Sequence, residues 1–432
     1  MEIAVIGSGM AGLATARILK DAGNNITVFE ALAGRGMDSH SLEFDGGIID
    51  APLRVMNPYL WKNTLSLATH LGISTFPVRT YMACSWLFAD KTETWLTTSR
   101  APIGNFPIIN NRKGLQQYGV RLVKGMLQLK SALYRFFKSK NQNITLTEFI
   151  NKNEIEEVFW NGAVMPVLYT ICTCNPETIG EWPAKPLLIF LRQLTNGDQL
   201  LRLHGGTSAL VSKLVEDVHF ESGSPVNKVE LQGEQVLVEN QAGFSKLFDR
   251  VIVATPTNKI EDFLNPQQFA DDIALLKQFR FEEGDLVIHT DSSVMPPKRK
   301  DWSVLSYMMD RQFTRQQFTV WMNAIEPTLV GKNAVFQTWR PVTPIDPKKI
   351  ISTVRLSRAV VTAKTVELNQ ELQRRQKAAD RKVYFCGSWS CDGLPILESA
   401  VTSAMQIGKN LGAPLPFVGL KPKVEVAPEL GY

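Results

Sequence analysis

Three glycines and one glutamate near the N-terminus have the types and spacing of a site for a dinucleotide. Gly7, Gly9 and Gly12 lie in the run GSGMAG, and Glu30 ends the next apolar stretch. In this pattern the first glycine permits a tight turn, the second lets a pyrophosphate approach the backbone, and the third allows a helix to pack closely on a strand. The carboxylate of Glu30 can accept hydrogen bonds from both hydroxyls of a ribose, and it would repel a 2′-phosphate. These residues predict a dinucleotide site that disfavours phosphorylated nicotinamide.

Strand and helix signals around these residues supply the context that such a site requires. The β-branched run at residues 3–6 predicts a strand that stops at Gly7, and apolar residues with helical spacing follow Gly12 as far as Gly23. Residues 26–30 predict a second strand. The phosphates would then lie at a helix N-terminus, where free N–H groups and the helix dipole favour negative charge. The alternative is a glycine-rich turn in an ordinary βαβ unit.

Composition and charge exclude several classes of protein. The chain has 432 residues, of which 44% are hydrophobic, so it can bury a sizeable core. Its formal net charge of +5 is too small to indicate a nucleic-acid partner. Five irregularly spaced cysteines favour buried thiols in a reducing compartment over disulfides, and no metal site is expected. The chain opens almost directly on a core strand and its longest apolar stretch is too short to span a bilayer, so we expect a cytoplasmic protein.

The dinucleotide-binding unit is predicted to be discontinuous, because sequence typical of such a unit returns twice. The run LHGGTSALV predicts a glycine turn that opens a helix, and residues 225–230 and 235–239 predict a β-hairpin. A strand at 383–386 is followed by a helix rich in small residues that begins near Leu397. We therefore expect an α/β fold with a Rossmann-type domain made of residues 1–75, 200–270 and 380–415. An inserted α+β substrate or cap domain would consist of residues 76–199 and 271–379. The last segment, residues 416–432, would be an extended tail.

Together these segments resemble the flavin-containing amine oxidase, protoporphyrinogen oxidase and phytoene desaturase superfamily over nearly the whole chain. After its second strand that superfamily has a glycine and basic segment and then an Asp-x-Gly. AGRGMDSHSLEFDGGIIDAP is similar, although Pro52 stands where glycine is common. HGGTSALV and CGSW with DGLPILESAVTSA are similar to the later cofactor-binding segments of the superfamily. Plain nicotinamide dehydrogenases lack the last of these, so the resemblance implies non-covalently bound FAD and a two-domain architecture like that of amine oxidases.

The resemblance also implies which residues hold FAD. Val226 would contact the adenine, while Gly387, Leu397 and Glu398 would lie near the pyrophosphate and the pyrimidine end of the flavin. The full set implied is Gly7, Gly9, Met10, Ala11, Gly12, Glu30, Ala31, Arg35, Gly36, Pro52, Leu53, Arg54, Val226, Ala254, Gly387, Ser388, Pro395, Leu397 and Glu398.

A closer resemblance lies in the inserted segments. GDLVIHTDSSVMPPKRKDWSVLSY, FTVWMNAIEP and VFQTWRPVTPIDPKKI are similar to a bacterial-type group of predicted NAD/FAD-binding proteins that often stand beside fatty-acid-modifying methyltransferases. The activity of most of that group is only inferred, so this resemblance brings no reaction with it.

The expected chemistry belongs to the flavin, which explains why no catalytic triad or pair of acids is needed. The apolar inserts favour an FAD-dependent dehydrogenase or desaturase that takes a hydride onto flavin N5 from a hydrophobic substrate, such as an unsaturated fatty-acyl chain or an alkyl-bearing ring. The carbon attacked should be allylic or otherwise activated. Arg54, His289 and Trp389 are the candidate catalytic residues. Arg54 would face the flavin, an anionic substrate group or a salt-bridge partner, and the alternative for His289 is a structural hydrogen bond within a strand.

Two other functions remain open. One is a flavin amine or imine oxidase that forms an imine and hydrogen peroxide. Amine oxidases commonly have an aromatic residue where this chain has Ile396, although Trp389 or an aromatic residue of the inserts would replace it. The other is a non-catalytic FAD-binding scaffold for a partner enzyme. The sequence does not choose among oxygen, a quinone and an electron-transfer protein as the electron acceptor.

One segment suggests contact with a membrane. RLVKGMLQLKSALYRFFKSK, residues 121–140, interleaves lysine and arginine with leucine, methionine and phenylalanine. A basic amphipathic helix of this kind is typical of peripheral binding to an anionic membrane, here the inner face, and would suit a lipid substrate. The alternative is a cap-domain helix with a solvated polar face.

Overall fold

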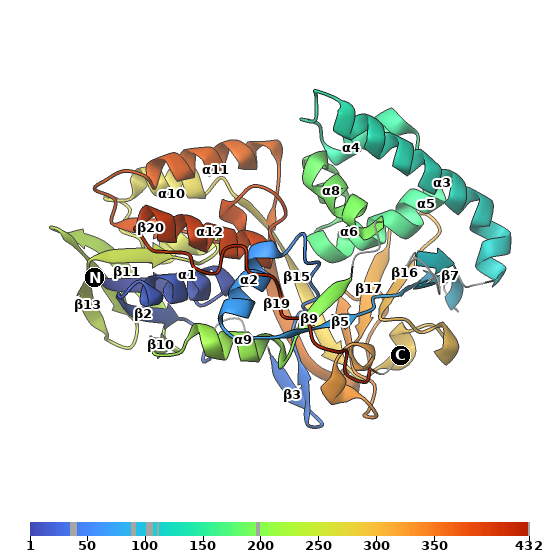
Figure 1. The fold of residues 1–432 in the computed structure, drawn as a ribbon, viewed down its shortest axis with the longest axis horizontal. Coiled ribbons are helices and arrows are strands. Elements are labelled where there is room, and N and C mark those ends of the chain that lie inside the picture. Colours follow the sequence, from blue (N-terminus) through green and yellow to red (C-terminus); the bar gives the residue numbers. More distant parts are fainter. Residues whose placement is uncertain (35–40, 88–91, 101–106, 110–111, 196–198, 431–432) are drawn as a thin grey trace.

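The computed structural model describes residues 1–34, 41–87, 92–100, 107–109, 112–195 and 199–430, which form two halves side by side along the long axis (Figure 1). One half is built on a five-stranded parallel sheet. Its strands, in spatial order, are β10 (His219–Ser222), β2 (Asn25–Glu30), β1 (Glu2–Ile6), β14 (Arg250–Val253) and β20 (Val383–Phe385). This strand, turn and helix arrangement confirms the predicted Rossmann-type fold.

Both faces of the parallel sheet are covered, and the first strand is accordingly apolar from Ile3 to Ile6. Ile3 and Val5 face helices α1 (Met10–Asp21) and α12 (Leu397–Asn410), with which they share one core cluster. Ala4 and Ile6 belong to a second cluster on the opposite face. That face is covered by α10 (Ala270–Leu276), α11 (Ala363–Arg375) and a three-stranded antiparallel sheet of β11 (Val226–Gln232), β12 (Gln235–Asn240) and β13 (Ser245–Phe248). The β11–β12 pair is the predicted hairpin.

The other half contains an eight-stranded mixed sheet. Its order is β19 (Ile350–Val360), β15 (Arg280–His289), β18 (Phe336–Trp339), β17 (Gln316–Trp321), β16 (Leu305–Met309), β6 (Met82–Leu87), β7 (Thr92–Arg100) and β8 (Pro107–Ile109). Two distant stretches of the chain meet where β6 and β16 pair in parallel, whereas the other neighbours are antiparallel. The predicted domain boundaries stay a prediction, but these strands all lie within the two inserted segments.

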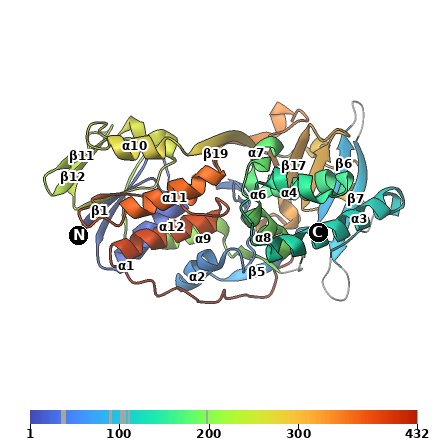
Figure 2. The ribbon, with the colours of Figure 1, turned by 90° about the horizontal axis from the view of Figure 1, so that it is seen from above.

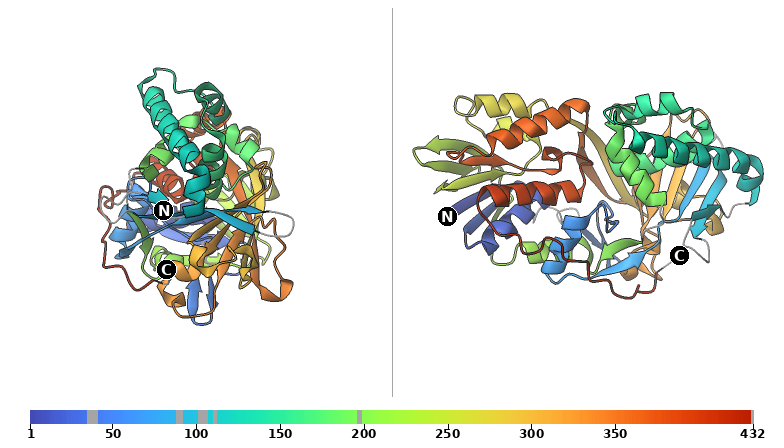
Figure 3. Two further views of the ribbon diagram at one scale, coloured as in Figure 1. Left: turned by 90° about the vertical axis from the view of Figure 1, so that its right-hand side faces the viewer. Right: turned by 45° about the horizontal axis from the view of Figure 1, so that its top comes forward.

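A layer of helices lies beside the eight-stranded sheet (Figures 2 and 3). It contains α3 (Arg112–Lys138), α4 (Leu146–Asn153), α5 (Glu157–Phe159), α6 (Met165–Cys172), α7 (Pro176–Gly180) and α8 (Ala184–Thr195). A capping box starts α4, because the Glu148 amide donates to Thr145 Oγ1 at 3.2 Å and the Thr145 amide donates to Glu148 Oε2 at 2.7 Å. None of the helices in the described ranges combines the length and apolar character needed to cross a bilayer.

Two long strands join the halves, and several short elements lie beside or between them. The short elements are β3 (Leu42–Phe44), β4 (Gly47–Ile49), α2 (Lys62–His70), β5 (Thr75–Val78), β9 (Leu200–Leu203) and α9 (Gly206–Leu214). Strand β15 starts just after α10 and β19 ends just before α11, so this antiparallel pair runs from the parallel-sheet half into the other. The C-terminal segment lies along β5, where the Thr75 amide donates to the carbonyl of Lys423 at 2.8 Å.

Candidate functional site

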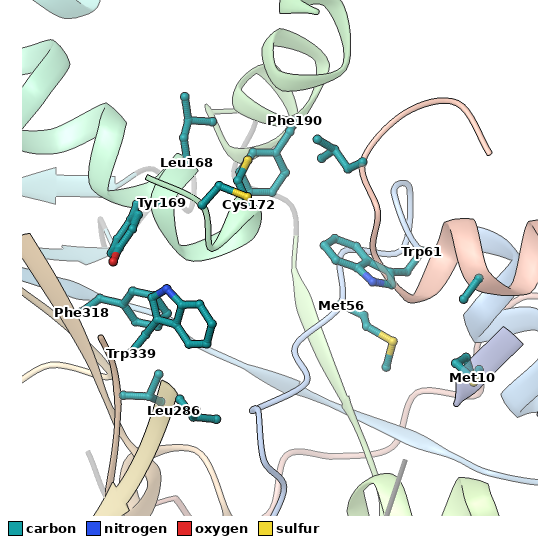
Figure 4. Close-up of a cluster of buried hydrophobic side chains, with 14 of the residues drawn as sticks. Met10, Met56, Trp61, Leu168, Tyr169, Cys172, Phe190, Leu286, Phe318 and Trp339 are labelled. Carbon is teal, nitrogen blue, oxygen red and sulfur yellow. The ribbon is translucent and has the colours of Figure 1, made fainter. Parts of the chain in front are cut away.

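A cavity of about 910 Å³ lies between the two halves of the molecule. On one side it is lined by the N-terminus of α1, the segment after β4 and the loops that follow β14 and β20. The other side is formed by α3, α6, α8 and the strands of the eight-stranded sheet. Figure 4 shows Met10, Met56 and Trp61 across this region from Phe318 and Trp339. The cavity therefore joins the predicted cofactor residues to the inserted segments.

The glycine turn leaves open space where a pyrophosphate would approach. Gly7 has φ of +98°, and a Cβ there would lie 3.1 Å from the Ala254 carbonyl oxygen. A Cβ on Gly12 would lie 1.9 Å from the Gly7 carbonyl oxygen, whereas one on Gly9 would meet no atom within 4 Å. Gly9 is the N-cap of α1 and no side chain caps this end of the helix. The open backbone at Gly9, Met10 and Ala11 lines the cavity and fits an anionic group.

Glu30 is held at the end of β2, beside the glycine turn. Its Oε2 accepts hydrogen bonds from the backbone N–H of Ser8 at 3.0 Å and from the Ser8 hydroxyl at 2.7 Å. Its Oε1 accepts from the backbone N–H of Leu32 at 3.0 Å. These bonds fix the carboxylate where the sequence predicts a ribose, and a carboxylate has further acceptor positions for hydroxyls.

The other predicted cofactor residues fall into three groups. The cavity brings together Gly9, Met10, Ala11, Pro52, Leu53, Arg54, Ala254, Gly387, Ser388, Pro395 and Leu397. Val226 and the exposed Ala31 do not line the cavity. Val226 begins β11 and packs in the hydrophobic cluster that contains Phe29. Arg35 and Gly36 lie outside the described residues. Four distant segments of the chain therefore meet at one site, and the residues that line it fit FAD.

Glu398 has a structural partner. Its carboxylate accepts hydrogen bonds from the backbone N–H groups of Asn63 at 3.0 Å and Thr64 at 2.9 Å, and from the Thr64 hydroxyl at 3.0 Å. It thereby caps the N-terminus of α2, where a negative charge is favoured. Glu398 does not line the cavity, although Leu397 beside it does. Its contact with FAD stays a prediction.

The segment that carries Arg54 is fixed by residues from three other elements. Gln337 Oε1 of β18 accepts from the Leu53 amide at 3.0 Å, and its Nε2 donates to the Asp50 carbonyl oxygen. The Asp50 carboxylate accepts from the Thr207 amide of α9 at 2.9 Å and from Arg202 Nη2 of β9 at 3.3 Å. Sequence reasoning missed Gln337 and Arg202, because no local pattern marks a contact between such distant positions.

Arg202 is the centre of a buried ion cluster. Its side chain is 1% exposed and contacts the carboxylates of Asp50 and Glu326, which are 2% and 6% exposed. Burying three charged groups is tolerated only when they are paired and hydrogen-bonded. The cluster therefore anchors the start of the Asp50–Arg54 segment in the interior.

Only two of the three candidate catalytic residues reach the cavity. Arg54 and Trp389 line it, and the Trp389 indole N–H donates to the Thr255 carbonyl oxygen at 3.3 Å. His289 is fully buried elsewhere in β15, where Nδ1 accepts from the Asp291 amide at 3.1 Å and Nε2 lies 2.8 Å from Thr338 Oγ1. Burial lowers the pKa of His289 to about 4, so the ring is neutral at pH 7. This position favours the structural hydrogen-bonding role of His289 over the catalytic one.

Comparisons with known proteins agree with this geometry. The profile of the family "Flavin containing amine oxidoreductase" matches residues 10–287. Lysine-specific histone demethylase 2 of Homo sapiens is 22% identical over 426 residues, and the match covers 90% of this chain but only 46% of that relative. The chain thus spans about half the length of the curated relative that it matches.

Solved structures share the fold at low identity. A putrescine oxidase bound to putrescine is 12% identical, with a TM-score of 0.61 and coverage of 95% of this chain and 99% of that chain. A CLA-producing fatty acid isomerase from P. acnes is 14% identical, with a TM-score of 0.63 and coverage of 94% and 97%. The family match shows that the chain belongs to the flavin-containing amine oxidoreductase family.

Proposed function

We propose that this chain is an FAD-dependent oxidoreductase that dehydrogenates a hydrophobic substrate, such as an unsaturated fatty-acyl chain or an alkyl-bearing ring. The observation that carries the proposal is the lining of the cavity beside the cofactor-binding segments. Leucine, valine, phenylalanine, methionine and tryptophan side chains dominate its walls. A large, mostly apolar cavity with a few polar groups is suited to an apolar ligand that is oriented at one end.

Residues of this chain would bind and orient the substrate, and bound FAD supplies the acceptor for a hydride. Leu286, Phe318 and Trp339 form a floor from three strands of the sheet, across the cavity from Met10 and Met56 (Figure 4). Helices α3, α6 and α8 line the cavity and would shield part of the apolar chain from water. This arrangement supports orientation of an alkyl chain by packing rather than by hydrogen bonds.

The described lining also limits which carbon can react. It contains no aspartate, glutamate, histidine or cysteine side chain that would accept a proton. The Tyr307 hydroxyl lies 2.8 Å from Thr170 Oγ1, and burial raises the pKa of Tyr307 well above its usual value. A substrate whose oxidation begins with hydride loss at an allylic or otherwise activated carbon fits such a site better than one that needs a strong base. Positive charges in the lining also disfavour an ammonium substrate.

The test is an anaerobic absorbance titration of the FAD-loaded protein. Monounsaturated fatty acids and phospholipids are added in one series, and alkyl and aryl amines in another. We expect the oxidised-flavin absorbance to bleach with a lipid substrate. Val320→Trp, which fills the cavity from β17, should keep FAD but stop bleaching, while Gln267→Glu, on the exposed surface of the other half, should behave as the wild type.

Two results would overturn the proposal. Bleaching by amines alone would identify an amine or imine oxidase. Flavin that stays oxidised with every compound, in protein that binds FAD, would favour a scaffold for a partner enzyme.

A further inference from the structure

Two arginines from opposite sides of the site line the mostly apolar cavity, to which the exposed Lys130 also contributes. Arg54 follows β4 in the segment held by Gln337, and Arg358 lies near the end of β19. Each is partly buried and lines the cavity. Arginine side chains in apolar surroundings normally have a carboxylate partner.

Neither guanidinium has an acidic partner among the described residues. The Nε atoms of Arg54 and Arg358 are buried and without a hydrogen-bond partner, and Arg358 Nη2 donates only a long bond, 3.4 Å, to the Ile171 carbonyl oxygen. Asp50, the acidic group that acts on Arg54, is already bound by Arg202 and by a backbone amide. Neither arginine therefore forms an ion pair within the described part of the chain, and Glu282, which lies opposite Arg358 across the β15–β19 pair, is bound by Arg340.

The electrostatics of the pair agree with this geometry. Burial, together with the positive charge of Arg358, lowers the pKa of Arg54 to about 10. Burial also lowers the pKa of Arg358. The neighbouring thiols of Cys172 and Cys174 are not counter-ions, because burial raises the pKa of both above its usual value and keeps them protonated. An anion placed between the two guanidiniums would remove both the repulsion and the unmet hydrogen-bonding capacity.

We propose that Arg54 and Arg358 form a subsite that binds the carboxylate of a long-chain acid whose alkyl chain fills the apolar remainder of the cavity. This inference rests on the proposed function, since it names the class of substrate. Guanidinium groups bind carboxylates through paired, charge-assisted hydrogen bonds, and lysine does not reproduce that planar geometry. The subsite would fix one end of the substrate and so decide which carbon of the chain lies at the flavin.

The experiment measures equilibrium binding to the FAD-loaded protein, so it does not depend on turnover. Oleic acid, its methyl ester, oleyl alcohol and an anionic phospholipid are titrated by calorimetry and by flavin difference spectra. The variants are Arg358→Met, Arg54→Met and Arg358→Lys. The matched control is Arg355→Met on the same strand, because Arg355 is 63% exposed and contacts Glu283 and Asp285 outside the cavity. Circular dichroism and FAD content verify that each variant folds.

We expect the wild type to prefer the acid to the ester, and Arg358→Met or Arg54→Met to weaken acid binding at least tenfold with little change for the ester. Arg358→Lys should recover only part of this preference, and the control variant should keep it. The inference would be overturned if the ratio of acid affinity to ester affinity stayed unchanged in both Met variants. It would also be overturned if these variants shifted the flavin reduction potential without losing affinity for the acid. Tighter binding of phospholipid than of acid would assign the pair to phosphate. Acid that binds without bleaching the flavin would overturn the proposed function and leave the subsite standing.

A separate observation concerns the outer surface of α3, which lies at the edge of the molecule (Figures 1 and 2). Its sequence contains no aspartate or glutamate, and it carries Arg112, Lys113, Arg121, Lys124, Lys130, Arg135 and Lys138. Val120, Val123, Leu127 and Tyr134 are 86%, 53%, 63% and 62% exposed. Their spacing places them on one face of the helix. An exposed apolar stripe beside basic residues is unfavourable in water unless something covers it.

From this second observation we infer that the α3 stripe binds an anionic membrane surface. The absence of acidic residues on the helix favours an anionic partner, and the exposed apolar side chains fit the boundary between lipid headgroups and chains. Met126, Leu129 and Leu133 of the same helix line the cavity. A protein docked in this way would have its substrate cavity beside the lipid.

Vesicle sedimentation tests the surface without any substrate. The full-length protein should sediment with vesicles of phosphatidylcholine and phosphatidylglycerol, and high salt or the double variant Val120→Glu/Leu127→Glu should release it. Gln267→Glu is the control for an added charge elsewhere. Equal sedimentation with pure phosphatidylcholine, or none with anionic vesicles, would overturn the inference and point to a protein partner for the stripe.

Discussion

Gly9 and Gly12 should respond in opposite ways to alanine, although both belong to the run GSGMAG. A Cβ on Gly9 meets no atom within 4 Å, and its φ of −67° suits alanine. A Cβ on Gly12 would lie 1.9 Å from the Gly7 carbonyl oxygen and 3.1 Å from the Ala254 side chain. We therefore expect Gly9→Ala to fold normally but bind FAD poorly, and Gly12→Ala to lose stability.

The magnitudes follow from these contacts. In Gly9→Ala, the reduced entropy of the unfolded chain stabilises by about 0.4–1 kcal/mol, and a poorer N-cap offsets a similar amount. The midpoint of thermal unfolding of the FAD-free protein should therefore change by no more than about 2 °C. The added methyl group occupies the space of the pyrophosphate, so FAD affinity should fall about 10–100-fold, which corresponds to about 1.4–2.7 kcal/mol. In Gly12→Ala, a methyl group forced into packed backbone costs about 1–3 kcal/mol or more.

The assay uses FAD-free wild type and both variants. Circular dichroism gives the thermal midpoint without FAD, and quenching of FAD fluorescence gives the affinity. Wild-type FAD affinity in Gly9→Ala would refute the assignment of the pyrophosphate to this turn. A loss of stability in Gly9→Ala as large as that in Gly12→Ala would show that the space beside Gly9 is not open.

Three further predictions concern buried groups. Arg202→Met should lower the free energy of unfolding in urea by about 3–5 kcal/mol, because the buried carboxylates of Asp50 and Glu326 lose their cation. Adding Glu326→Gln to this variant should recover part of the loss. A loss below about 1 kcal/mol in Arg202→Met would contradict a stabilising ion cluster. The pKa of His289 is about 4 in the folded protein, which is below its value of about 6.5 in the unfolded chain. As the pH falls, the unfolded chain therefore binds a proton before the folded protein does. The free energy of unfolding should fall by up to about 1.4 kcal/mol per pH unit between about pH 6.5 and 4. His289→Gln should flatten that part of a stability profile measured by urea unfolding, and an unchanged slope would contradict the burial argument. Glu398→Ala should cost about 1–2 kcal/mol through the lost cap of α2, measured in the same way, and a loss of only a few tenths would show that the cap contributes little.

Local pattern was enough to predict the elements that form the cofactor site. The first strand, the glycine turn, its helix and the later hairpin each depend on residues close together in the sequence, and the structure has them all. The polar contacts that hold the site were not predictable in this way. Gln337 reaches Leu53 across 284 positions, and its sequence neighbourhood gives no sign of that partner.

Arg358 illustrates what a strand pattern does and does not show. Arg355 and Arg358 both lie in β19, and an odd separation places them on opposite faces of the sheet. The pattern does not say which face borders a cavity. That assignment depends on packing against segments far away in the chain, including the end of α6 and the segment held by Gln337.

The strand order of the parallel sheet has a consequence for synthesis on the ribosome. β1 pairs with β2 on one side, but its other neighbour, β14, begins only at residue 250. At a translation rate of about 5–20 residues per second, one apolar edge of β1 would stay unpaired for on the order of 10–50 s until β14 is synthesised. β20 closes the sheet later still, after β19 has been made. Nascent chains thus expose one unpaired apolar edge of β1 until β14 has been made, so folding of the cofactor half should depend on protection from aggregation over that interval.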